Sequence, residues 1–148
     1  MKIYTIGHSN LPYGKFLDIL IAYDIRALAD VRSHPYSRYA AWSRKKPLEQ
    51  ALSKAGIDYH YLGKKLGGKP FEKMADFYDR ERNPLFVVGM QKLITIATDE
   101  KTVIMCSEAK PNRCHRQNLI GRHLVNRGWE VIHIQRDGSN IVQQPMLL

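Results

Sequence analysis

The sequence predicts an α/β domain of three layers (α/β/α), in which helices cover both faces of a mainly parallel, Rossmann-like sheet. Two observations predict it. Short apolar runs typical of strands alternate with helical patterns along the chain. Most of the helical patterns are roughly ten residues or longer, the length that a crossover between parallel strands requires. With 148 residues, of which 44% are hydrophobic, the chain is expected to form one domain over residues 1–148.

The expected strands are short and rich in aliphatic and β-branched residues. The later strands each follow a helical pattern. The last segment is weaker, because it comes after the turn residues Asp137 and Gly138, and it is expected to lie at an edge. In order, we expect strands at residues 2–6, 27–31, 57–62, 103–105 and 130–134, and a short edge strand at 141–142.

The expected helices carry apolar residues at helical spacing, or start and stop signals. Phe16 and Leu20 lie on the apolar stripe of the first helix. Ser9 or Asn10 is its expected cap, and Gly56 is expected to end the second helix. In order, we expect helices at residues 12–23, 47–55, 71–81, 84–98 and 114–127.

The chain is strongly basic, with a net charge of +9 and a pI near 9.7. Such a surface attracts phosphates, whether they belong to nucleotides, nucleic acid or anionic membranes. No apolar run approaches the ~20 residues of a membrane-spanning helix, and the first residues already form a strand pattern, which leaves no room for a signal peptide. We therefore expect no membrane association and a cytoplasmic protein, in which Cys106 and Cys114 stay reduced.

Polar side chains stand where the expected strands end. Ligands of open parallel sheets bind outside the carboxyl ends of the strands, so we expect these side chains to share one site. Loops are polar in any case, which is the simpler explanation for each residue taken alone. The set comprises His8 and Ser9 after the first strand, Asp30, Arg32 and Ser33 at the second, and Cys106, Ser107 and Glu108 at the fourth.

Cys106 and Cys114 are the only cysteines, and both are expected beside this site. A thiol in the first turn of the helix at 114–127 would lie near the positive end of the helix dipole and near Arg113 and Arg116. These charges favour the thiolate, so either sulfur could act as a nucleophile while the other resolves a covalent or oxidised intermediate. The structural alternative is that Cys114 packs as a small hydrophobe and that Arg116 pairs with Glu108.

Two phosphate-binding motifs fit the sequence poorly. A cysteine-dependent phosphatase loop needs a shorter spacing between its Cys and Arg than the six residues that separate Cys106 from Arg113. The segment at residues 63–70 has the spacing of a P-loop, but Pro70 stands where that motif needs Ser or Thr. We therefore expect a glycine loop there and no nucleotide triphosphatase.

A metal site is also disfavoured. Its ligands would have to be drawn from Cys106, Cys114, His115, His8 and His133. Cys114 and His115 are adjacent on an expected helix, so their side chains diverge by about 100°. The short cysteine spacing of structural zinc sites is lacking as well. We therefore expect neither a metal nor another cofactor.

The loop expected at residues 32–46 contains five cations and no acid, interleaved with Tyr36, Tyr39 and Trp42. Cations for phosphates together with rings for base stacking are typical of nucleic-acid contact. Alternatively, Tyr39 and Trp42 pack on the domain while the cations are solvated. Asp30 and Arg32 point to the same side of their strand, either as a structural ion pair or with Asp30 holding Arg32 toward an anionic ligand.

Four stretches occur in a characteristic order: residues 5–9, residues 30–35 followed by Ser37 and Arg38, residues 66–68, and residues 106–108 followed by Pro111 and residues 114–116. In these stretches the chain resembles the uncharacterised family known as domain of unknown function 488. The resemblance extends from the first strand to about residue 133. It implies the same three-layer α/β fold and places Arg32 and Arg38 in the site. It implies no activity, because the family has no settled one.

Two functions agree with these observations. The first is a cysteine-dependent enzyme that acts on a phosphate-bearing substrate, nucleic acid or a nucleotide, at the carboxyl edge of the sheet. The second is a non-catalytic nucleotide or nucleic-acid binding module whose cysteines are structural or redox-sensing. For the enzyme, the expected catalytic residues are Cys106, Glu108, Cys114, His8 and Asp30, and the expected substrate-binding residues are Ser9, Arg32, Ser33, Arg38, His115 and Arg116.

Overall fold

A six-stranded sheet with the order β3-β2-β4-β1-β5-β6 forms the centre of the protein. The computed structural model describes residues 1–68, 74 and 76–145. Strands β1 to β5 pair parallel with their neighbours, and β6 pairs antiparallel with β5 at one edge. The strands are β1 (Lys2–Gly7), β2 (Ala27–Asp30), β3 (Asp58–Tyr61), β4 (Thr102–Cys106), β5 (Glu130–Ile134) and β6 (Asn140–Val142).

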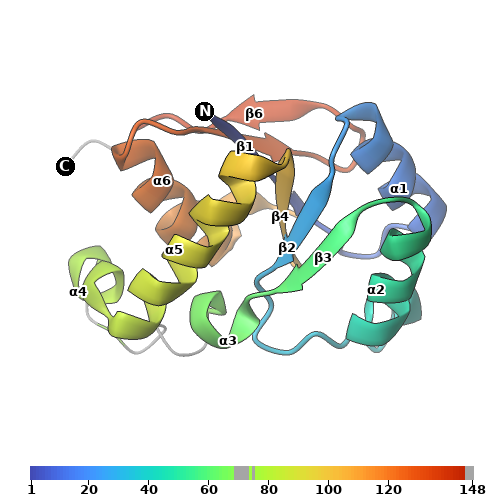
Figure 1. Ribbon diagram of the computed structural model, residues 1–148, viewed down its shortest axis with the longest axis horizontal. Coiled ribbons are helices and arrows are strands. Elements are labelled where there is room, and N and C mark those ends of the chain that lie inside the picture. Colours follow the sequence, from blue (N-terminus) through green and yellow to red (C-terminus); the bar gives the residue numbers. More distant parts are fainter. Residues whose placement is uncertain (69–73, 75, 146–148) are drawn as a thin grey trace.

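Helices cover both faces of this sheet, with α1 and α2 on one side and α5 and α6 on the other (Figure 1). The α-helices are α1 (Tyr13–Ala22), α2 (Lys45–Lys54), α3 (Gly63–Leu66), α4 (Phe77–Arg82), α5 (Pro84–Asp99) and α6 (Arg122–Asn126). Short 3₁₀ turns lie at η1 (Ala41–Ser43) and η3 (Pro111–Arg113), and η4 (Arg116–Gly121) is π-helical.

The hydrophobic core is divided in two by the sheet. Successive side chains of a strand point to opposite faces, so β4 supplies Val103 to one half of the core and Ile104 to the other. The half with Val103 includes Phe16 of α1 and Leu52 of α2, and the half with Ile104 packs on α5 and α6. The predicted α/β fold with a mainly parallel sheet is therefore confirmed.

Three local predictions were wrong. The expected cap of the first helix is not used, because Pro12 is the N-cap residue and no side chain caps the helix. Residues 63–66, expected in a glycine loop, form the helix α3, which buries Leu66. The segment expected as one helix at residues 114–127 begins instead with η4 and continues as α6. Of the helix expected at residues 71–81, residues 71–73 and 75 lie outside the described residues, and α4 begins at Phe77.

The carboxyl ends of the central strands β1, β2 and β4 lie next to one another. Gly7, the last residue of β1, is opposite Cys106, the last residue of β4, and Asp30 at the end of β2 is opposite Met105. The chain segments that follow these strands therefore start from one edge of the sheet. None of the helices in the described part of the chain is long and apolar enough to cross a membrane.

Candidate active site

Cys106 and Cys114 form a pair of buried sulfurs at the carboxyl end of β4. After Cys106 the chain leaves the sheet, passes through η3 and returns at Cys114, which places the two Sγ atoms 3.0 Å apart. Both cysteines are free, and their exposed fractions are only 3% and 7%. The pair is held against β1 by two backbone hydrogen bonds beyond the strand ends, from His8 N to the Cys106 carbonyl and from Ser9 N to the Ser107 carbonyl, each 2.9 Å.

Arg116 contacts this sulfur pair from the interior of the protein. Its side chain is fully buried, and its Nη1 donates to Cys106 Sγ over 2.6 Å. The same guanidinium donates to the backbone carbonyls of Glu108 and, over 3.1 Å, of Ala109. Glu108 contributes only its carbonyl here, since its carboxylate accepts from the amide of Lys110. The ion pair between Arg116 and Glu108 that was considered from the sequence is not formed.

The lack of a side chain at Gly7 makes room for this arrangement. A Cβ atom at Gly7 would collide with the backbone carbonyl of Glu108 and would lie 2.7 Å from Arg116 Nη1. Only glycine lets the loop after β4 fold back over the end of β1. The glycine that precedes His8 is therefore a structural requirement of the sulfur site.

The hydrogen bond between the two thiols shifts their pKa values in opposite directions. The hydrogen bond with Cys106 is the largest cause that lowers the pKa of Cys114, and together with His115 it brings this pKa to about 4 against the opposing effect of burial. The same hydrogen bond, together with burial, raises the pKa of Cys106 well above its usual value, although Arg116 acts in the opposite direction. None of the ion pairs in the described structure involves Arg116, so a thiolate in the sulfur pair, which Arg116 contacts at Cys106 Sγ, would balance this buried cation.

His115 is the second polar group in contact with Cys114. Its Nδ1 lies 3.6 Å from Cys114 Sγ, and its Nε2 is buried without a hydrogen-bond partner among the described residues. The contact arises because Cys114 has an extended backbone (φ −130°, ψ 145°) and η4 starts only at Arg116. The expected divergence of adjacent helical side chains therefore does not apply. An imidazole at this place can deliver a proton to a group bound at the sulfur, or remove one.

A cavity of about 660 Å³ opens in front of the sulfur pair. Its wall contains residues expected in the site and two arginines from elements other than the strand ends. Arg80 reaches it from α4 and Arg113 from η3, and neither forms an ion pair with the described residues. Among the expected site residues, the cavity is lined by Arg32, Ser33, Cys106, Glu108, Cys114 and His115.

Asp30 and Arg32 form a saturated structural pair. Arg32 binds both carboxylate oxygens of Asp30, through Nε at 2.9 Å and Nη2 at 2.8 Å. Its other N–H groups point to Ser43 and His8, and Tyr59 donates to Asp30 over 2.6 Å. Every N–H of the guanidinium thus has a partner within the protein. The pair fixes η1 against the sheet and leaves neither group free for proton transfer or for an anion.

The remaining expected residues lie beside the sulfur site rather than in it. His8 is buried, its Nδ1 is 2.9 Å from the carbonyl of Ser9, and burial lowers its pKa. With Ser9 it lines a neighbouring hollow of about 580 Å³, which also includes Tyr36 and Tyr39. Arg38 is exposed on the loop and is not part of the described wall of either cavity.

The sequence matches the family model described as "Domain of unknown function DUF488" over residues 12–122. The chain therefore belongs to this family. The match includes β2, β4 and the segment with Cys106, Cys114 and Arg116, and it excludes His8 and Ser9. No curated protein and no solved structure matches the chain significantly.

Proposed function

We propose that the protein is a cysteine-dependent enzyme that acts on a phosphate-bearing substrate, a nucleotide or nucleic acid. The observation that supports this most is the buried Cys106–Cys114 pair, which Arg116 contacts at Cys106 Sγ and which opens into a cavity that Arg80 and Arg113 line. Burying a charge beside two closely spaced sulfurs costs folding free energy. A site with only a packing role would not need such an arrangement. We keep the cytoplasm as the proposed location because this chemistry requires reduced thiols.

In the proposed reaction Cys114 is the nucleophile. Its thiolate attacks an electrophilic centre of the substrate, so that a bond from Sγ forms while the bond to the leaving group breaks, and His115 gives the leaving group a proton. Water then attacks the same centre, returns its proton to His115 and releases Sγ as the thiolate. The net reaction is hydrolysis of the substrate. Before the attack and after the release of Sγ, the thiol of Cys106 stabilises the Cys114 thiolate and keeps the pKa of Cys114 low.

The phosphate serves as the group by which the substrate is held. Arg80 and Arg113 are the cavity cations without an ion-pair partner in the described structure, and they replace Arg32, Arg38 and Arg116 as the proposed anion-binding residues. A guanidinium can bind a phosphate through two N–H groups, which also orients the substrate.

The second candidate is a nucleic-acid binding module, which the surface of the loop at residues 32–46 favours. Tyr39 and Tyr36 have exposed fractions of 88% and 61%, and Arg44 stacks on the Tyr36 ring at 4.3 Å. Trp42, in contrast, packs on Phe16 in the core and donates to the carbonyl of Leu11. The two exposed rings line the hollow next to the sulfur cavity and offer faces on which bases could stack.

Protection of Cys114 from alkylation tests the proposal. The protein is treated with iodoacetamide at low salt with or without a nucleotide mixture or a random single-stranded oligonucleotide, and modification is read by intact mass. We expect one of these probes to slow the labelling of Cys114, and the protection to weaken as salt is added. The same probe should be turned over by the wild-type protein and left intact by Cys114→Ser.

Charge-matched variants identify where the phosphate is held. Arg80→Gln and Arg113→Gln should each weaken the protection, whereas Lys2→Gln, which removes a cation at the amino end of β1, should not. Protection without any turnover would favour the binding module. Turnover that persists in Cys114→Ser, or labelling that no phosphate compound affects, would contradict the proposed enzyme.

A further inference from the structure

A second cluster of chemically active side chains lies at the opposite end of the sheet from the sulfur pair. Asp58 and His60 stand two residues apart on β3, so their side chains project from the same face of the sheet. Glu100 is the C-cap residue of α5, two residues before β4 begins. Asp58 and Thr102 both pair with Ala27, at the amino end of β2, and this register brings the three side chains together.

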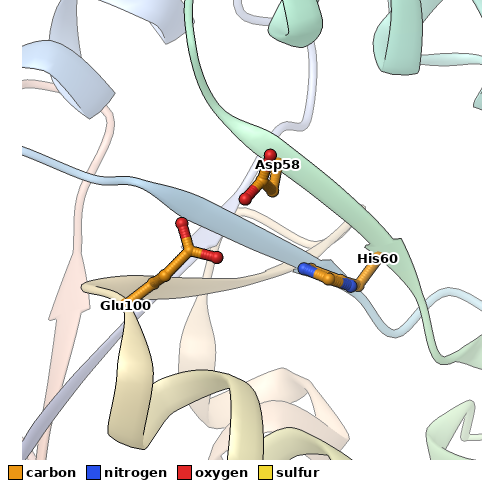
Figure 2. A group of neighbouring side chains, drawn as sticks. All are labelled: Asp58, His60 and Glu100. Atoms are coloured by element: carbon orange, nitrogen blue, oxygen red, sulfur yellow. The ribbon is translucent and has the colours of Figure 1, made fainter.

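The three side chains converge on one point in space. Figure 2 shows the imidazole ring of His60 directed toward the carboxylates of Asp58 and Glu100. One ligand atom from each residue lies within 4.8 Å of the other two. Around a tetrahedral ion with bonds of about 2.1 Å, ligand atoms are roughly 3.4 Å apart. Asp58 is exposed and Glu100 is partly exposed, so rotation of their side chains can close this difference.

Two observations favour a cation at this cluster. The carboxylates of Asp58 and Glu100 bring two negative charges together, while the guanidinium of Arg26 forms an ion pair with Asp24 at 3.4 Å instead. Independently, Nε2 of His60 is buried and has no hydrogen-bond partner in the described structure. A metal ion would both neutralise the carboxylates and occupy an imidazole nitrogen.

We propose that Asp58, His60 and Glu100 bind a divalent transition-metal ion of the Zn²⁺ type. The two carboxylates match the charge of such an ion, and the imidazole favours Zn²⁺ and its neighbours over Mg²⁺ and Ca²⁺, which prefer oxygen ligands. Three protein ligands leave a fourth position for water or a small anionic molecule. The site does not depend on the function proposed for the thiols, because it lies at the amino ends of the strands.

Co²⁺ is a suitable probe, because it replaces Zn²⁺ and its visible absorption depends on its ligands. Nitrogen and oxygen ligands give weak visible bands, whereas thiolates add intense sulfur-to-metal absorption in the near ultraviolet. We expect the full-length protein to bind about one Co²⁺ with the weak bands only. His60→Gln and Asp58→Asn should each weaken this binding by about tenfold or more. Excess Mg²⁺ should not displace the ion.

Asp99→Asn is the matched control, because it removes an exposed carboxylate next to Glu100 without changing a proposed ligand. Its Co²⁺ affinity should stay within about twofold of the wild type. Circular dichroism of each variant establishes that the fold is retained. A sulfur-to-metal band, an unchanged affinity in both ligand variants, or no binding at millimolar Co²⁺ would each overturn the proposal.

Discussion

Cys114 owes most of its acidity to the thiol of Cys106, whose Sγ lies 3.0 Å from its own and which, together with His115, lowers its pKa to about 4. Neighbouring cations alone would act on both sulfurs. The hydrogen bond makes the pKa values of the two sulfurs differ, because the proton that remains on one sulfur stabilises the charge on the other. The reactivity of the site is therefore a property of the pair.

Removing the donor at position 106 should raise the pKa of Cys114 toward the ordinary thiol range. In Cys106→Ala the rate of alkylation of Cys114 at pH 6 should fall by about a hundredfold, because most of the thiolate is then protonated. Cys106→Ser, which keeps an O–H donor, should lose much less. The measurement is the labelling rate between pH 4 and pH 9. Equal rates in the two variants would show that the hydrogen bond is not the cause.

Replacing Arg116 should leave the thiolate without its compensating charge. Arg116→Met is expected to lower the free energy of unfolding by about 3–5 kcal/mol, the usual cost of breaking a buried pair on one side. The free energy of unfolding of Arg116→Lys should lie between those of Arg116→Met and the wild type, because lysine keeps the positive charge but lacks the planar set of N–H donors of a guanidinium. The measurement is urea unfolding at pH 7.

Arg113→Met is the control for this substitution. Arg113 is exposed, so its loss should change the free energy of unfolding by no more than about 0.5 kcal/mol. An Arg116→Met protein as stable as Arg113→Met would mean that the thiol pair carries no charge in the folded state.

At the level of elements, the place where the loop after β4 covers the end of β1 tolerates little change. Gly7→Ala should lower the free energy of unfolding by about 1–3 kcal/mol, because its methyl group meets the backbone of Glu108, which cannot move like a side chain. Gly14→Ala in α1 is the matched control. No atom lies within 4 Å of its Cβ position, and alanine favours helix, so it should be neutral or slightly stabilising. Thermal unfolding of both variants provides the comparison.

The strands and long helices could be predicted because each has its own periodicity, as in α5, where Phe86, Met90, Leu93 and Ala97 face the core. The convergence of Cys106 with Cys114 could also be predicted, since the ends of parallel strands and the starts of the helices that follow them lie at the same edge of the sheet. The start of the π-helical turn η4 could not be predicted from the sequence. A π-helical turn arises where tertiary contacts override local preference, and here the buried Arg116 side chain anchors the turn.

Two other features of the site cannot be recognised from the local sequence. Nothing in the sequence links Arg80 on α4 to Cys114, because only the packing of α4 beside α5 and η4 brings it to the cavity. Likewise, Asp30 and Arg32 were expected to serve the ligand. Their hydrogen bonds with Ser43 and Tyr59, which saturate them, come from segments whose approach the sequence does not indicate.

At the scale of the whole molecule, the sheet separates two polar centres. The sulfur pair lies at the carboxyl ends of the strands, and the cluster of Asp58, His60 and Glu100 lies at the amino ends. Between them the sheet is packed on both faces with apolar side chains. A substitution in one centre should therefore change the stability without altering ligand binding at the other, since distant sites are usually additive.

Burial of neutral histidines should make the whole protein less stable in acid. Burial lowers the pKa of His133 to about 4, while its two ring nitrogens contact Thr5 and Gln143. Burial also lowers the pKa values of His8 and His123. In the unfolded chain these groups titrate near 6.5. Between about pH 6.5 and pH 4 the unfolded state thus binds more protons than the folded state, and the free energy of unfolding must fall as the pH falls.

The His133 contribution alone is about 3 kcal/mol across that interval. The depressed pKa of Cys114 acts in the same direction, because the folded thiolate loses its advantage as the pH falls toward about 4. Urea unfolding at pH 8, 6.5 and 5 should therefore show a steady loss of stability. His133→Gln should flatten the pH dependence, whereas His34→Gln at an exposed position should not. A free energy of unfolding that stays constant from pH 8 to pH 5 would mean that the pKa values of these side chains are the same in the folded and the unfolded protein.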